Sequence, residues 1–325
     1  MQFRLPFTRL LAWAGLVVLL SATVACGDGD TTEAAESDTT EAAADDGSEE
    51  TEESAAPESL ERPTLPEDAD PDIAVFEDFE AATFSNPTVI DNAYLPYAPG
   101  NRILLSGTTV EDGEEFAHQI RYVVTDLTKE ILGVETVVVW IEDYSDDELV
   151  EAEIAFYAQD DAGNVWFFGE HPEEYEDEEL IDAPTWIAGV DGAYPGIVMH
   201  ADPQLDTPAY FQGWGPAVEW SDFAVVEVVG EEICIELGCF PDSITIAESS
   251  LDEEGIAQLK SYAPDVGNIE VGFRGDDATQ EELEVVDHSP VSAEELASFG
   301  ALAKALEASA YEVSAETYGA TTPIE

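Results

Sequence analysis

Basic residues are scarce in this chain of 325 residues, which has 9 Lys and Arg against 74 Asp and Glu and a formal net charge of −65. Proteins that bind nucleic acids or anionic membranes through basic patches need the opposite balance of charge. The composition therefore excludes both kinds of binding, and we expect no nucleic-acid partner.

Cysteine is also scarce, with three residues in the whole chain, which excludes a disulfide-dense scaffold and a zinc site with four cysteine ligands. The sequence contains no HExxH motif, no serine elbow and no phosphate-binding loop. It therefore indicates no catalytic residue and no cofactor, and it does not identify a reaction.

The first 25 residues contain no acid and have two cations, Arg4 and Arg9, followed by an apolar run of about 16 residues. A membrane-spanning helix needs about 20 such residues, so the run is typical of a signal peptide. It ends in Thr23-Val24-Ala25-Cys26, which resembles a bacterial lipobox. The resemblance implies cleavage before Cys26, lipidation of Cys26, and a chain anchored by lipid on the extracytoplasmic face of the cell membrane. An ordinary secretory signal is the alternative.

Residues 26–72 follow as a stretch without any aromatic residue, and from Gly27 onward it carries 18 acids and one cation, Arg62. Such a segment buries too little apolar surface to offset the loss of chain entropy. We expect a disordered acidic tether between the lipid and the folded part of the protein.

Residues 73–310 are expected to form a mainly β domain. In residues 150–158, apolar side chains alternate with Glu151, Glu153 and Tyr157, which predicts a half-buried strand. Similar runs predict strands at residues 102–110, 116–124, 136–142, 165–168, 223–229, 244–247, 258–262, 269–273 and 282–286. Short strands with tight turns favour an antiparallel meander that forms a sandwich or a half-open barrel.

One C-terminal helix is expected to pack on this sheet. It should begin at the capping box of Ser292 and Glu295. Leu296, Phe299 and Leu306 then recur on one helical face. Residues 311–325 are expected to be a frayed tail.

Two acidic segments, residues 143–152 and 174–183, are similar to each other, and two hairpins with acidic turns explain them. The loops around them, residues 143–151 and 170–182, would also be the places for divalent cations to bind. The weak candidates for metal ligands are Glu170, His171, Glu173 and Glu174, because carboxylate and imidazole groups suit such ions. A solvated acidic loop is the favoured alternative.

Cys234 and Cys239 lie too far apart on a straight strand to form a disulfide, but Gly238 makes a turn plausible. We expect a structural disulfide, with free thiols as the alternative. His118 is expected to be a buried histidine whose hydrogen bonds are satisfied. The tryptophans are expected in the core, although a ligand cavity inside a half-barrel is also compatible with the pattern.

Four runs together resemble an uncharacterised family of bacterial secreted and lipid-anchored proteins: DNAYLPYAPG, YAQDDAGNVWFFGE, GVDGAYPGIVMHADP and YAPDVG, spread over roughly residues 84–286. The resemblance implies an exported β-rich domain and brings no activity. In this chain His200 stands where the family pattern has proline, and acidic turns near Asp147 and Glu178 replace glycine-type turns.

The favoured function is therefore a lipid-anchored binding or envelope-structural module whose ligand and oligomeric state are unknown. The alternatives are a secreted hydrolase that uses carboxylates and an acidic surface protein that binds divalent cations. Residues 73–325 retain 56 acids and 6 cations. Because salt screens repulsion between like charges, we interpret this acidity as an adaptation to a salty habitat.

Overall fold

The computed structural model describes residues 60–325 apart from residues 68, 112 and 254. The expected signal peptide, Cys26 and the stretch up to residue 59 lie outside the described residues. Described residues between 60 and 72 form coil and turns, and Arg62 makes an ion pair with Asp78 at 3.3 Å. A short 3₁₀ helix, η1 (Phe79–Ala81), follows.

The described chain is mainly β, as the sequence predicts. Ten strands account for most of it: β1 (Arg102–Glu111), β2 (Glu114–Ile131), β3 (Val134–Ser145), β4 (Glu148–Gln159), β5 (Val165–Glu176), β11 (Phe223–Ile235), β12 (Gly238–Ser249), β13 (Ala257–Ala263), β14 (Gly267–Arg274) and β15 (Glu282–Asp287). Each of them contains one of the ten predicted runs, so those predictions are confirmed.

Five short strands were not predicted: β6 (Glu179–Asp182), β7 (Trp186–Ile187), β8 (Tyr194–Met199), β9 (Tyr210–Phe211) and β10 (Gly213–Trp214). A second 3₁₀ helix, η2 (Pro216–Val218), lies after them. Strands of two to six residues give too short an alternation to be recognised. β8 also contains Pro195 and Gly196, which are unfavourable within strands.

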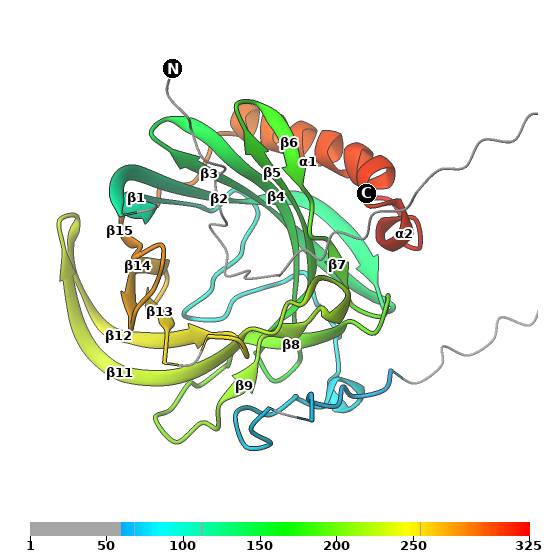
Figure 1. Cartoon of the computed structure of the whole chain (residues 1–325), viewed down its shortest axis with the longest axis horizontal. Coiled ribbons are helices and arrows are strands. Elements are labelled where there is room, and N and C mark those ends of the chain that lie inside the picture. Colours follow the sequence, from blue (N-terminus) through cyan, green and yellow to red (C-terminus); the bar gives the residue numbers. More distant parts are fainter. Residues whose placement is uncertain (1–59, 68, 112, 254) are drawn as a thin grey trace, which may run out of the picture. The chain divides into compact units, whose positions relative to one another are not determined.

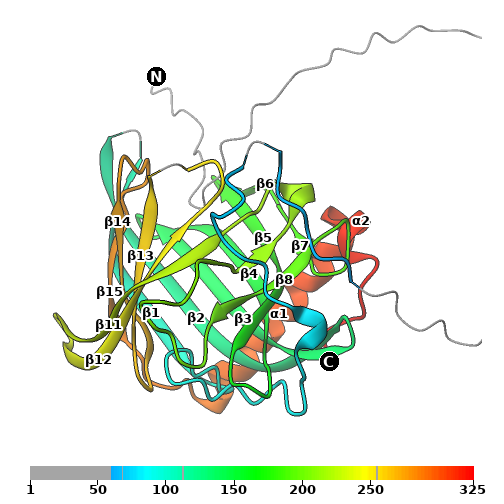
Figure 2. The ribbon, with the colours of Figure 1, turned by 90° about the horizontal axis from the view of Figure 1, so that it is seen from below.

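The strands form one antiparallel sheet that curls into a nearly closed barrel (Figure 1). Their order is β10-β8-β5-β4-β3-β2-β1-β15-β14-β13-β12-β11-β9, with β6 and β7 paired to β5. The two ends of this order, β9 and β10, are separated in sequence by Gln212 alone, so the curled sheet returns close to its start. Of the two predicted architectures, a sandwich and a half-open barrel, the half-open barrel is therefore confirmed. Figure 2 shows β1 to β5 as long inclined strands on one side of it.

The two acidic segments form hairpins, as predicted. Asp146 and Asp147 turn between β3 and β4 with φ of 47° and 67°, and Asp177 and Glu178 turn between β5 and β6 with φ of 51° and 67°. Two consecutive left-handed residues are the geometry of a two-residue hairpin. The chain therefore makes tight turns at acidic residues in place of glycine.

Helix α1 (Ala293–Val313) begins at the predicted capping box, in which Ser292 accepts from the Glu295 backbone and Glu295 accepts from that of Ser292. The helix lies on the outer side of the sheet and contacts β2, β3 and β4 (Figure 1). Ala303, Leu306 and Ala310 are buried there.

The expected frayed tail is wrong. Helix α1 runs to Val313, α2 (Ala315–Tyr318) follows, and the Tyr318 side chain is fully buried. The Glu325 backbone N–H donates to the carbonyl of Thr128 at 2.9 Å, which ties the last residue to β2. Buried aromatic and apolar side chains pack this segment against the rest of the protein. The sequence pattern did not predict this packing because the segment has no helical periodicity of apolar residues.

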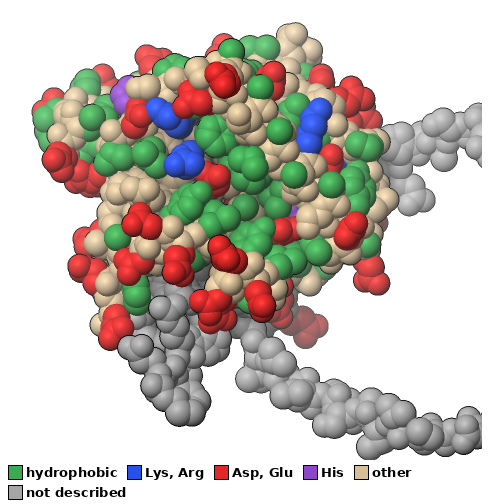
Figure 3. Space-filling view, turned by 90° about the horizontal axis from the view of Figure 1, so that it is seen from above, with side chains coloured by type: hydrophobic (Ala, Val, Ile, Leu, Met, Phe, Trp, Pro, Cys, Tyr) green, Lys and Arg blue, Asp and Glu red, His purple; other side chains and the backbone are tan. Residues whose placement is uncertain are grey.

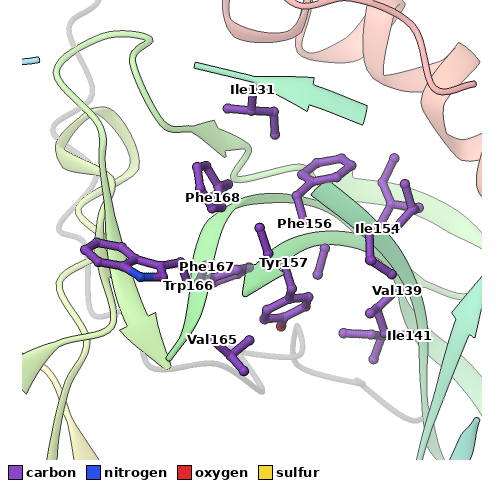
Figure 4. Packing of buried hydrophobic residues seen from close by; sticks show 14 of the residues in the cluster. Ile131, Val139, Ile141, Ile154, Phe156, Tyr157, Val165, Trp166, Phe167 and Phe168 are labelled. Atoms are coloured by element: carbon purple, nitrogen blue, oxygen red, sulfur yellow. The ribbon is translucent and has the colours of Figure 1, made fainter. Parts of the chain in front are cut away.

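The two faces of strand β4 contribute to two different regions, the hydrophobic core and the inside of the barrel. Four of its apolar residues at alternate positions, Ala152, Ile154, Phe156 and Ala158, join the main core. Tyr157 lies on the opposite side of the strand from Phe156 (Figure 4). Because Glu151 and Glu153 are 7% and 5% exposed, the prediction of a half-buried strand is wrong: the acidic face of β4 faces the inside of the barrel.

Candidate functional site

The barrel encloses a cavity of about 170 Å³, which is the candidate site. A cavity of about 150 Å³ is enough to hold benzene, so this one has room for a small organic molecule. Six aromatic side chains line it: Tyr97, Tyr122, Tyr157, Phe167, Trp220 and Tyr262. Of the tryptophans expected in the core, Trp140, Trp166 and Trp186 are buried, and Trp220 lines the cavity.

The aromatic residues on one side of the cavity form a continuous wall. The ring of Tyr157 stacks on Phe167 with centroids 4.9 Å apart, and Tyr97 meets Tyr157 edge-on at 5.1 Å. Phe167 in turn meets Trp220 at 5.7 Å. This wall is fixed by its own contacts, so it would present ring surface to a ligand without rearranging.

The cavity is also strongly acidic. Seven carboxyl side chains line it: Asp143, Glu151, Glu153, Glu170, Asp222, Glu248 and Glu281. They project inward because adjacent strands of the barrel each contribute alternate residues to the interior. One cation, Lys260 of β13, is among the lining residues.

Glu153 of β4 and Glu170 of β5 form a hydrogen-bonded carboxyl pair. Burial, and then the nearby Glu170 and Glu151, raise the pKa of Glu153 well above its usual range. Burial also raises the pKa of Glu170 to about 7, against the hydrogen bond that Trp186 Nε1 donates to Glu170 Oε1 at 3.0 Å. The pair therefore shares a proton, which Glu153 holds and Glu170 accepts.

Glu151 lies in a row of three acids that crosses neighbouring strands. Asp143 of β3 is its register partner on one side, and Glu174 of β5 is its partner on the other. Like charges directly opposite each other on a sheet repel. Burial, followed by the charges of Glu174 and Glu170, raises the pKa of Glu151 to about 8.

Lys260 is already engaged on the other side of the cavity. Its Nζ lies 2.5 Å from Glu248 Oε2, and Gln212 Nε2 donates to Glu248 Oε1 at 2.9 Å. Burial lowers the pKa of Lys260, but the carboxylate of Glu248 outweighs it and the net pKa is raised. Burial, and then Glu248, also raise the pKa of Asp222.

His118 lies beside the cavity in contact with two of its acids. Its Nε2 is 2.8 Å from Glu281 Oε1 and its Nδ1 is 3.4 Å from Asp143 Oδ1. The side chain is fully buried. The expectation of a buried histidine is confirmed, but its ring nitrogens contact the two acids without completing a hydrogen bond, so the expectation of satisfied hydrogen bonds is not confirmed.

Two tyrosine hydroxyls at the cavity stand out. Tyr157 and Tyr262 are 9% and 8% exposed and line the cavity, and within the described part of the chain no hydrogen bond of either hydroxyl is found. Burial raises the pKa of both, so both remain protonated donors. Buried polar groups are normally paired, so these two are available to a molecule in the cavity.

The structure brings two of the four predicted metal candidates together: His171 Nε2 lies 3.5 Å from Glu173 Oε1. Glu170 faces the cavity, whereas His171 Nδ1 lies 2.6 Å from Thr185 Oγ1, and the His171 ring packs on Tyr318 beneath α2. Glu173 accepts from the Tyr175 hydroxyl at 2.5 Å. Burial lowers the pKa of His171 to about 4.

In the part of the chain that the structure describes, one group of three His, Cys, Asp or Glu residues has its ligand atoms within 4.8 Å of one another: Glu232, Cys234 and Cys239. Cys234 and Cys239 are opposite each other at the β11–β12 turn and are joined by a disulfide, so they offer no thiolate. The segment at residues 160–164 is a hairpin turn in which Asp160 accepts from the backbone of Ala162 and Asn164.

The sequence pattern does not identify Glu153, Asp222 and Lys260 as site residues, and it includes Glu151 only within the acidic loop at residues 143–151. The alternation of Glu151, Glu153 and Tyr157 was the available signal, but the same pattern fits a strand whose polar face meets solvent. Which face of a strand lies inside is fixed only when the sheet closes, and closure depends on contacts between residues far apart in sequence.

No family model matches the chain, and no curated protein sequence matches it. The crystal structure of a "putative lipoprotein" from Parabacteroides distasonis ATCC 8503 shows a likeness with a TM-score of 0.33 and 12% identity, over 61% of this chain and all of that one. Because the TM-score is below 0.5, this likeness supports neither a fold family nor a function. Among the described helices, none has the length and apolar character to span a membrane.

Proposed function

We propose that this protein is a lipid-anchored extracytoplasmic binding protein whose barrel holds a small ligand in its interior cavity. The observation that carries the proposal is a cavity of about 170 Å³ lined by the buried residues Tyr157 and Tyr262, whose hydroxyls make no hydrogen bond within the described part of the chain. A core built for stability alone would fill such a space or satisfy such groups.

The wall composition also favours binding. Small-molecule sites combine aromatic surface with a few placed polar groups, and here a stacked aromatic wall adjoins carboxyl groups with raised pKa values. Clusters of perturbed ionisable groups are enriched at functional sites.

The proposal is tested by filling the cavity. Val198 lines it, and Val198→Phe adds a ring to that space. Val89→Phe, at a side chain that is 59% exposed, is the matched control. The full-length chain and both variants are titrated in thermal-shift and calorimetric experiments with four probes: choline, benzoate, glucose and 3,3-dimethylbutan-1-ol.

We expect at least one probe to bind the wild type and the Val89→Phe variant and to lose binding in Val198→Phe. If every probe fails, or if binding is equal in the two variants, the cavity is not a binding site and the proposal is overturned.

The anchor is tested separately. Replacing Cys26 with serine removes the only thiol that the lipobox resemblance offers for lipidation, so we expect the chain to move from the detergent phase to the aqueous phase in a detergent partition experiment. A variant that still partitions with detergent would contradict lipid anchoring at this residue.

A carboxylate-based hydrolase is the second candidate, and the shared proton of Glu153 and Glu170 is the observation that favours it. Two carboxyls that share a proton can act as acid and base. The two groups touch, whereas retaining glycosidases separate them by about 5 to 5.5 Å. Hydrolysis of peptide substrates that is lost in both Glu153→Gln and Glu170→Gln would support this function over binding alone.

A further inference from the structure

We propose that the ligand is a small organic cation, an amine or quaternary ammonium compound, held against the aromatic wall by Glu151, Glu153 and Glu170. This inference rests on the proposed function of the cavity and names the chemical class of its ligand. Four features of the cavity lead to it: its charge, the position of its rings, the spacing of its carboxyls and the groups that surround them.

The charge of the lining excludes an anion. Seven acids line the cavity, and Lys260 already forms an ion pair with Glu248. An anion entering near β4 and β5 would meet Glu151, Glu153 and Glu170 with no cation among them. A cation there would offset the repulsion within the acidic row.

The aromatic wall lies beside these acids. Tyr157 of β4 is the register partner of Phe167 of β5, and Glu170 is the partner of Ala155, which lies between Glu153 and Tyr157 on β4. The two rings therefore adjoin the two carboxyl-bearing positions on neighbouring strands, and all four side chains line the cavity. Cations are attracted to the faces of aromatic rings, and more strongly where water is excluded. Rings and carboxyls on the same wall are a combination suited to alkylammonium groups.

The spacing of the carboxyls disfavours a metal ion. Calcium takes six to eight oxygen ligands at about 2.3 to 2.6 Å, which requires oxygens that converge on a point. In the described residues, Glu151, Glu153 and Glu170 do not form a group with oxygens within 4.8 Å of one another. An organic cation has a larger radius and needs no such convergence.

The acids are faced by titratable groups from several strands. From β3, Asp143 faces Glu151, and from β5 Glu174 and Glu170 do so. Tyr97, Tyr122 and Tyr157 adjoin Glu153, while Lys260, Glu248, Asp222, Glu281 and His118 surround the remainder of the cavity. Lys260 is the one lysine or arginine among the lining residues. A cation bound beside the β4–β5 acids would favour their charged form, so binding should release a proton from these acids to the solvent.

The experiment compares two probes of the same shape. Choline and 3,3-dimethylbutan-1-ol differ at the central atom, which is a charged nitrogen in one and a neutral carbon in the other. Acidic side chains are spread over the face of the protein shown in Figure 3 and would attract any cation. The titrations are therefore done in 1 M NaCl, where the screening length is about 3 Å, with the full-length chain.

We expect choline to bind at least about tenfold more tightly than the alcohol at pH 7. In buffers of different ionisation enthalpy, choline binding should release protons and alcohol binding should release none. Glu153→Gln and Glu170→Gln should each weaken choline binding by about tenfold and leave alcohol binding unchanged. Glu316→Gln, at an exposed position on α2, is the control.

The outcomes separate the two proposals. If the alcohol or glucose binds as tightly as choline, and Val198→Phe abolishes that binding, the cavity is a binding site but the cationic ligand is wrong. If calcium binds in 1 M NaCl with loss in Glu153→Gln and choline does not, the site is a metal site and the inference is overturned. If no probe responds to Val198→Phe, both proposals fail.

Discussion

Two sites in this fold hold a lysine beside carboxylates, with the Lys129 side chain fully buried and the Lys260 side chain 22% exposed, and the sites differ in how completely the charges are matched. Lys129 of β2 lies outside the sheet beneath the C-terminal helices, and its Nζ is 2.9 Å from Glu307 Oε1. It also donates to the Thr322 carbonyl and lies 4.4 Å from the centre of the Tyr318 ring. The Ile324 backbone N–H donates to both oxygens of Glu307.

The cavity site has the opposite balance. Lys260 is paired with Glu248, and its charge also acts on Glu153 and Glu170, but among the described residues no lysine, arginine or histidine forms an ion pair with Glu151, Glu153 or Glu170. At the Lys129 site, the lysine pairs with one glutamate, and backbone groups supply the remaining hydrogen bonds of both side chains. The outer site, Lys129 with Glu307 and the Ile324 backbone, ties the C-terminus to β2. The inner site, Glu151, Glu153 and Glu170, lines the cavity and is the place to which we assign the proposed ligand.

The largest expected effect comes from breaking the outer site. Lys129→Met leaves the Glu307 carboxylate buried without its cation, and breaking a buried ion pair in this way costs about 3 to 5 kcal/mol. We expect a loss of that size in the free energy of unfolding, measured by urea denaturation at pH 7.

The double variant Lys129→Met with Glu307→Gln is the control, because it removes both charges. It should recover part of the lost stability. A single variant that is as stable as the wild type would show that the outer pair does not fasten the C-terminus.

The second effect concerns pH and arises from the inner site. Glu151 and Glu170 have pKa values raised to about 8 and about 7, so the folded chain binds their protons more tightly than the unfolded chain. Their contribution to stability is full below the unfolded pKa of about 4.3 and is lost as pH rises through 7 and 8.

His171 acts in the opposite direction at lower pH. Its pKa is lowered to about 4 by burial, so stability rises with pH between about 4 and the unfolded value of about 6.5. Above pH 6.5, His171 no longer changes the stability, and only the loss of protons from Glu151 and Glu170 affects it. We therefore expect the free energy of unfolding to fall on the order of 2 kcal/mol between pH 6.5 and 8.5.

Glu151→Gln should flatten this decline, because it removes the group with the higher of the two stated values. Urea denaturation at several pH values measures it, with Glu316→Gln as the exposed control. An undiminished slope in Glu151→Gln would mean that the inner acids are not the origin of the pH dependence.

The same contrast explains what could be predicted from the sequence. The ten long strands and the start of α1 follow from local patterns, such as the alternation in β4 and the capping box at Ser292. The inner site depends on which face of β4 is enclosed, and that is set when β9 returns to the neighbourhood of β8 and β10. The outer site depends on Lys129 meeting Glu307, 178 residues away. Neither long-range contact leaves a periodic signal in the sequence.

The smallest expected effect compares one hydroxyl from each region. Tyr311, near the outer site, donates its hydroxyl to the Thr321 carbonyl at 3.3 Å, whereas the Tyr157 hydroxyl at the cavity has no partner among the described residues. Tyr311→Phe should therefore cost about 1 kcal/mol of unfolding free energy, and Tyr157→Phe should change it by less than about 0.5 kcal/mol. Urea denaturation of the ligand-free chain measures both. If Tyr157→Phe costs as much as Tyr311→Phe, the cavity hydroxyl belongs to the fold in the same way as the outer one. The Tyr157 hydroxyl would then not be free to bind a ligand.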